Sequence, residues 1–177
     1  MADGMITQQG RILLARLLHG DLLAGLTHCA LGDGDASFID PLHPPLPTAD
    51  QVGLCHERVR KAADRRTYLV EDAAGTLVVN GVAYRETTEP TPVLGVFFHF
   101  SEEEANGFPI REYGFFGGGV TYVAGAAGTV ALDGVYDADT NPDGQVLTPG
   151  YLYEVWTIPD LIKTSAMQLQ LVGIIGV

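Results

Sequence analysis

Two histidine–cysteine pairs are the first residues in this sequence whose types suggest chemistry. His28 precedes Cys29 and Cys55 precedes His56, so that two imidazoles and two thiolates are available for one zinc ion. Adjacent residues of an extended chain point to opposite faces, which hinders both members of a pair from reaching the same ion. Neither a Cys-x-x-Cys nor a His-x-x-x-His spacing occurs. We therefore expect two free, buried thiols and no zinc.

An acidic loop near residue 140 is the second candidate for metal chemistry. Asp139, Asn141, Asp143 and Gly144 match the first, third, fifth and sixth positions of a calcium loop. The twelfth position, which normally supplies a bidentate carboxylate, is Gly150. Because Asn-Pro-Asp-Gly is also a plain turn signal, we favour a turn over a calcium site.

The sequence contains no distinctive set of catalytic residues. Ser37, Ser101 and Ser165 are the serines of the chain, and none lies in a Gly-x-Ser-x-Gly elbow. Glu102 and Glu112 can be paired as glycosidase carboxylates, but any acidic β-protein offers such pairs. We expect a protein that is not an enzyme and that holds no cofactor.

Two glycine-containing stretches suit tight backbone geometry and contact between subunits better than catalysis. One is the acidic turn Gly32-Asp33-Gly34, and the other runs from Ile110 to Phe115. Between them, five of the ten basic side chains lie within residues 58–66, which reads as a solvated helix face or as a patch for an acidic neighbour. The predicted interface residues are Gly32, Asp33, Gly34, Arg58, Arg60, Lys61, Ile110, Arg111, Glu112, Gly114 and Phe115.

The elements that must position these residues are predicted from hydrophobic periodicity. A helix capped by Thr7 is expected over residues 7–26, and a second helix over 49–64. Four prolines make residues 32–47 a loop. Strands are expected from residue 67 onward, the last of them over 167–171. The predicted fold class is α+β, with two N-terminal helices packed on a mainly antiparallel sheet or sandwich in a single domain (a helical part over 1–66 and a β-rich part over 67–177).

Composition narrows the functional class. The chain of 177 residues is 46% hydrophobic and carries a net charge of −12, which argues for an ordered protein and against a duplex nucleic-acid binder. The N-terminus lacks the pattern of a signal peptide, and no apolar run is long enough to span a membrane. We expect a soluble protein that binds neither nucleic acid nor membrane and is synthesised in a cytoplasm.

Three motifs together resemble the N-terminal attachment domain of the phage tail-collar fibre proteins. In that family a leading helix runs into Thr-x-x-Ala-x-Gly-Asp-Gly, which is matched by residues 27–34. A later Leu-x-x-Glu-x-x-Arg is matched by residues 54–60, and Ile-Arg-Glu-x-Gly-Leu-Phe by residues 110–116, with Phe115 in place of leucine. Family members often continue into a long fibrous shaft, whereas this sequence stops at Val177.

The resemblance implies a structural virion protein of a contractile tail, an adaptor that attaches tail fibres to the baseplate without catalysis. It implies baseplate wedge proteins and fibre or spike proteins as partners, repeated copies of the chain in the virion, and synthesis in the host cytoplasm. The alternative is a carbohydrate-binding module for a host receptor at the tail tip, using aromatic residues among Tyr122, Tyr136, Tyr151, Tyr153 and Trp156. A glycan hydrolase carried on the fibre is a third possibility.

Overall fold

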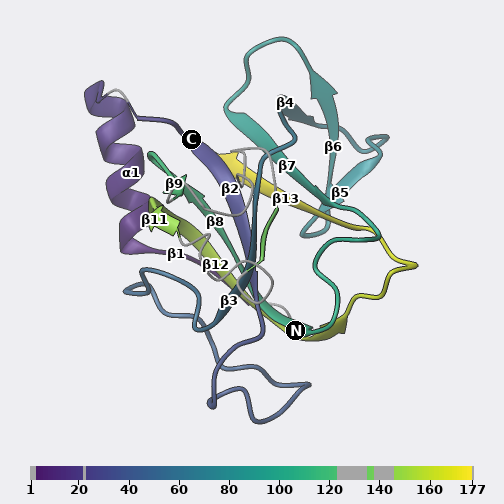
Figure 1. Cartoon of the computed structure of the whole chain (residues 1–177). Helices are drawn as coiled ribbons and strands as arrows, with labels where there is room; N and C mark the ends of the chain where they lie inside the picture. The colour runs from purple at the N-terminus through teal and green to yellow at the C-terminus, as the bar shows by residue number, and fades with distance from the viewer. Residues whose placement is uncertain (1–2, 22, 123–134, 138–145, 177) are drawn as a thin grey trace.

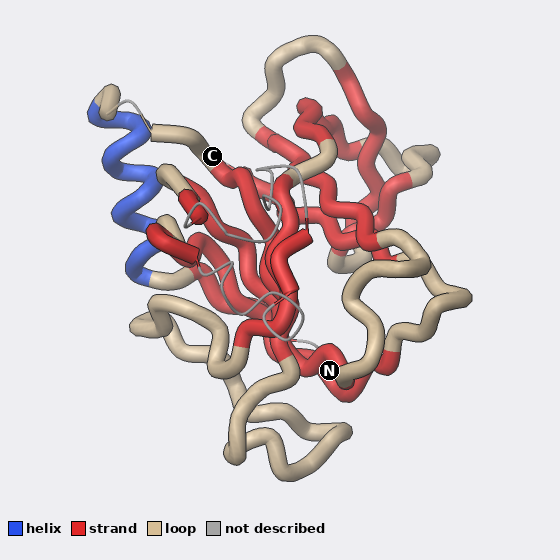
Figure 2. The backbone as a smooth tube through the Cα atoms, viewed as in Figure 1, coloured by secondary structure: helices blue, strands red, loops and turns tan. Residues whose placement is uncertain are grey.

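The described part of the chain forms two large antiparallel β-sheets and a short two-stranded pair, with one helix at the side of the larger sheet (Figures 1 and 2). The computed structural model describes residues 3–21, 23–122, 135–137 and 146–176. In spatial order the six-stranded sheet contains β1 (Asp3–Ile6), β12 (Tyr151–Ile162), β8 (Pro109–Gly117), β2 (Leu26–Gly32), β3 (Glu57–Ala62) and β10 (Val135–Asp137). The five-stranded sheet contains β13 (Leu169–Gly176), β7 (Val93–Phe100), β4 (Arg65–Glu71), β6 (Val82–Thr87) and β5 (Leu77–Val79). A short pair joins β11 (Val146–Thr148) to β9 (Thr121–Tyr122).

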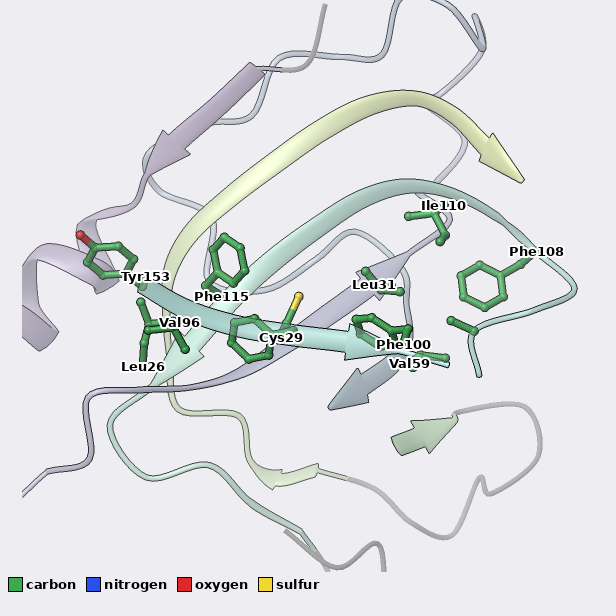
Figure 3. Packing of buried hydrophobic residues seen from close by; sticks show 12 residues of the cluster. Leu26, Cys29, Leu31, Val59, Val96, Phe100, Phe108, Ile110, Phe115 and Tyr153 are labelled. Atoms are coloured by element: carbon green, nitrogen blue, oxygen red, sulfur yellow. The ribbon is translucent and has the colours of Figure 1, made fainter. Parts of the chain in front are cut away.

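The main core lies between the two sheets. Cys29 and Leu31 of β2 and Phe115 of β8 face Val96 and Phe100 of β7 across this interface (Figure 3). All five side chains are at most 2% exposed. Alternate residues of β2 and β8 point the other way into a second cluster, which contains Ala30, Phe116, Val120, Leu152 and Val155. The central strands are therefore buried on both faces, which explains their continuous apolar sequences.

The first predicted helix is present but shorter than expected. α1 spans Gln8–His19, with Thr7 as its N-cap and Gly20 as its left-handed C-cap. The Thr7 hydroxyl accepts a hydrogen bond from the Gly10 amide and donates one to the Leu152 carbonyl of β12. A Cβ on Gly10 would lie 2.3 Å from the Tyr153 carbonyl oxygen, so this glycine lets the helix pack directly on the strand.

The second predicted helix, over residues 49–64, is wrong, and with it the α+β fold class. Residues 57–62 form β3, which pairs with β2, and residues 49–56 are irregular. In β3 the Val59 side chain enters the core between the sheets, while the Arg60 guanidinium lies over the Phe116 ring in the second cluster. That alternation has a period of two and not 3.6. The described chain is mostly β, with a single helix.

Residues 1–66 do not form a separate helical part, because they supply three strands of the larger sheet. The strands expected beyond residue 66 largely correspond to β4 to β8, β12 and β13. In the parts of the chain that the structure describes, no helix is long and apolar enough to cross a lipid bilayer.

Candidate functional site

The acidic turn and the Ile110–Phe115 block, far apart in the sequence, are neighbours in the sheet. β2 pairs with β8 so that Gly32 lies opposite Glu112 and Ala30 opposite Gly114. On its other side β2 pairs with β3, where Gly32 lies opposite Glu57. Segments from all three motifs noted in the sequence therefore meet at one end of three adjacent strands.

Glu112 is the centre of this meeting point. Its carboxylate is fully buried and accepts hydrogen bonds from the backbone amides of His56 (2.8 Å) and Cys55 (3.0 Å). Burial raises the pKa of Glu112, because the loss of hydration outweighs these hydrogen bonds and that of the Gly34 amide, which favour the charged form. A Cβ on Gly32 would lie 2.6 Å from the Glu112 Oε1 atom, so a glycine is needed opposite this side chain.

Two ion-pair systems flank Glu112. Asp33 contacts His56 Nδ1 at 2.6 Å and accepts a hydrogen bond from the Arg58 guanidinium at 2.7 Å. Arg111 donates to both carboxylate oxygens of Asp160, at 2.8 and 3.1 Å, and also to the Asp33 carbonyl oxygen at 3.4 Å. The Asp160 pair raises the pKa of Arg111. We call these residues the anchor cluster: Asp33, His56, Arg58, Arg111, Glu112 and Asp160.

The anchor cluster holds the two ends of a long irregular segment, residues 35–54, which we call the arm. The arm contains Pro41, Pro44, Pro45 and Pro47, which disfavour regular structure. It is tethered at two further points: the Asp160 amide donates to the Pro41 carbonyl (2.9 Å), and the Gln8 amide donates to the Ala49 carbonyl (2.7 Å). In Figures 1 and 2 the arm forms the loops below the sheets.

The arm exposes large apolar side chains to solvent. Ile39 is 86% exposed, Leu46 72%, Leu42 68% and Val52 64%. Four such residues lie on one segment of a tethered loop, and exposed apolar side chains that gather in one region can mark an interaction site. By contrast, Phe38 is buried against Gly34, which has a φ of +72°. The anchor cluster and Phe38 therefore fix the base of the arm, and its tips remain free for contact.

Two predicted basic interface residues have partners within the chain. Arg60 is 2% exposed, bonds Glu57 through two nitrogens (2.6 and 2.7 Å), and lies 3.8 Å from the Phe116 ring centroid. Lys61 contacts Glu104 at 2.9 Å and donates to the His99 carbonyl. These two cations do not form the solvated helix face that the sequence suggested.

The other predicted residues divide between the anchor cluster and the core. Gly32, Asp33, Gly34, Arg58, Arg111 and Glu112 come together at the base of the arm, while Ile110, Gly114 and Phe115 are buried. An interface role for the eleven residues remains a prediction, since no partner chain is present. Neither Asp160 nor the exposed apolar residues of the arm were predicted from the sequence. The alternation of aliphatic residues with prolines in the arm could have indicated an exposed apolar loop.

The structure describes little that suits a metal ion. The adjacent residues His28 and Cys29 lie on β2, and the Cys29 thiol is buried in the core, whereas Cys55 is exposed at the base of the arm. Among the described residues, no group of three or more His, Cys, Asp or Glu side chains is placed to hold a metal. The calcium candidates Asp139, Asn141 and Asp143 lie outside the described residues.

Described aromatic side chains that the sequence offered for sugar binding are engaged inside the chain. Trp156 stacks on Tyr113 with ring centroids 5.9 Å apart, and its ring covers Gly4 of β1. Tyr153 is buried, and the Tyr151 hydroxyl accepts a hydrogen bond from Arg16. The side chains of Tyr122 and Tyr136, the other two candidates, are outside the description.

No protein-family model matches this chain, and no curated protein matches its sequence. Its function therefore has to come from the anchor cluster, the arm and the motif resemblance. In the anchor cluster each carboxylate bonds to donors of the same chain, so the arrangement can hold a segment rigidly. The arm offers an apolar contact surface.

Proposed function

We propose that this protein is a structural attachment protein of a contractile phage tail or a related contractile injection machine, where it joins fibres to the baseplate and catalyses no reaction. The observation that carries the proposal is the convergence of residues 27–34, 54–60 and 110–116 on the anchor cluster. These three segments resemble tail-collar motifs. Because they contact one another in the fold, their occurrence together in one sequence has a physical explanation: they form one unit that fastens a loop to a sheet.

The chemistry of this unit suits attachment. A binding loop on a rigid scaffold presents its contacts with little loss of conformational entropy. The anchor cluster supplies that rigidity, and the arm supplies apolar side chains more than 60% exposed. Such an arm would fit an apolar groove on a neighbouring protein of the tail.

The test is to locate the protein in particles. Gold-labelled antibodies raised against the full chain would be applied to purified particles from the source of this sequence and viewed by electron microscopy. We expect label at the baseplate rim, and none after the antibody has been absorbed with the recombinant protein. Particles that lack the protein and still carry a full set of fibres would refute the proposal.

Receptor binding is the competing hypothesis, and it has its own measurement. A carbohydrate-binding module would show saturable binding on a glycan array and a matching change in Trp156 fluorescence. We expect neither, because the described aromatic rings contact one another or other residues of the chain. Saturable binding to one glycan would favour the receptor-binding module.

A further inference from the structure

An apolar pocket lies beside α1, and no residue of the arm lines it. It has a volume of about 280 Å³ and lies between α1 and the ends of strands from both sheets. In Figure 1 the C-terminal half of α1 and the end of β13 are at the top of the view, while the arm is at the bottom. The apolar side chains that form most of the lining are Leu13, Leu14, Leu17, Leu26, Leu94 and Ile175.

We propose that this pocket receives the arm of a second copy of the chain, so that copies associate head to tail. The arm exposes Ile39, Leu42 and Leu46 within eight residues, and they have the aliphatic character of the pocket lining. A cavity of about 150 Å³ can enclose a benzene molecule, so this pocket has room for about two branched side chains. The inference goes beyond the proposed function, because it concerns contact between identical chains.

The arm does not fill the pocket of its own chain, because none of its residues lines the pocket and its large apolar side chains are exposed. The backbone hydrogen bonds of Pro41 and Ala49 tie it to Asp160 and to Gln8, at the N-terminal end of α1. The pocket is lined by the later turns of the same helix, including Leu17. Because these tethers hold the arm outside the pocket in the folded chain, the contact that we propose is intermolecular. A projection that fits a pocket elsewhere on the same molecule forms a heterologous contact, which generates a ring or a filament.

Charge also favours a second copy as the occupant. The arm carries Asp35, Asp40 and Asp50 and contains neither lysine nor arginine. The exposed residue Arg66 lies beside the pocket, because it lines an adjoining depression together with the pocket residues Tyr68 and Leu94. An acidic arm that enters the pocket would bring a carboxylate to this guanidinium, which steers the encounter and fixes its direction.

Sedimentation of the full chain tests this inference without reference to a virion. We expect concentration-dependent association in about 0.15 M salt, which screens the repulsion between acidic chains beyond about 8 Å. The double variant Leu42→Ser and Leu46→Ser removes two exposed side chains and should weaken association roughly tenfold or more. The matched control is Leu18→Ser on α1, which removes an 86% exposed leucine outside the arm and the pocket lining and should leave association unchanged.

A variant that blocks the pocket provides the second half of the test. Gly25 lines the pocket, and a Cβ there would meet no heavy atom within 4 Å, so Gly25→Phe adds a large ring at the pocket without a clash at its Cβ. This variant should also lose association. A mixture of the arm variant and the pocket variant should form heterodimers and nothing larger, because only one arm and one pocket of each pair remain intact.

Three outcomes would overturn the inference. The first is a wild-type chain that stays monomeric up to about 1 mM. The second is association that neither the arm variant nor the pocket variant weakens, and the third is a mixture that forms no heterodimer. A negative result in these association experiments does not change the result expected from the localisation experiment, so the two proposals can be rejected separately.

Discussion

Replacement of Glu112 by glutamine tests whether the buried carboxylate holds the base of the arm. The carboxylate accepts hydrogen bonds from the His56 and Cys55 amides at 2.8 and 3.0 Å. Glutamine keeps one acceptor oxygen and turns an NH₂ group toward the second amide, which leaves a buried donor without an acceptor. Hydrogen bonds to charged groups contribute about 1.5–3 kcal/mol each, but the carboxylate also loses its hydration on burial. We expect a net loss of about 1–3 kcal/mol.

The assay is urea unfolding followed by the fluorescence of Trp156, the single tryptophan of the chain. Trp156 is a suitable reporter because it stacks on Tyr113 in the folded protein. Glu103→Gln is the matched control, since that carboxylate is exposed and its loss should change the free energy of unfolding by less than about 0.5 kcal/mol. Glu112→Gln with the stability of the wild type would refute the anchoring role.

The pH dependence of the same comparison gives a second readout. The folded-state pKa of Glu112 is raised above its ordinary value of 4.5, so the folded protein binds this proton more tightly than the unfolded chain does. The stabilising contribution of protonation is fully present below pH 4.5 and is lost as the pH rises through the folded-state pKa. The advantage of the wild type over Glu112→Gln should therefore grow as the pH falls from about 7 toward 4.5. An advantage that shrinks over this range would contradict the reasoning.

Three further predictions concern neighbouring residues. Gly32→Ala should cost about 1–3 kcal/mol in thermal or urea unfolding, because the new Cβ would lie 2.5 Å from a backbone oxygen at the base of the arm; an unchanged stability would contradict this packing. Arg60→Met should cost about 2–4 kcal/mol in urea unfolding, because it leaves the Glu57 carboxylate without its cation, and the double variant with Glu57→Gln should recover part of the loss. With iodoacetamide at about pH 8, the exposed Cys55 should react slowly, because partial desolvation and the nearby carboxylates raise its pKa to about 11, and the buried Cys29 should react only on unfolding. Fast labelling of native Cys29 would place that thiol outside the core.

Local signals in the sequence predicted elements whose hydrogen bonds are local. The first helix begins where Thr7 predicts it, because a capping hydroxyl and its amide partner are three residues apart. Its end was placed too late because Leu22, Leu23 and Leu26 extend the apolar pattern, whereas Gly20 in a left-handed conformation ends the helix. β7, over residues 93–100, lies in the part of the chain beyond residue 66 where strands were predicted.

The error over residues 49–64 has a tertiary cause. Val59 and the neighbouring basic residues fit a helical face as well as a strand, so propensity alone does not separate the two states. The choice is made by pairing with β2, which opposes Leu31 to Val59 and Ala30 to Arg60. A helix over these residues would place their basic side chains in solvent. In the structure Arg60 instead pairs with Glu57 and lies over the Phe116 ring.

The sequence by itself determined which segments are apolar and alternating, where a helix can start, and that four prolines keep residues 32–47 irregular. Only the tertiary structure decided that β2, β3 and β8 are adjacent, and hence that Asp33, Arg58 and Glu112 share one site at the base of the arm. The physical reason is that strand hydrogen bonds and ion pairs join residues distant in the chain. Their partners are set by the register of the sheets, which no single segment encodes.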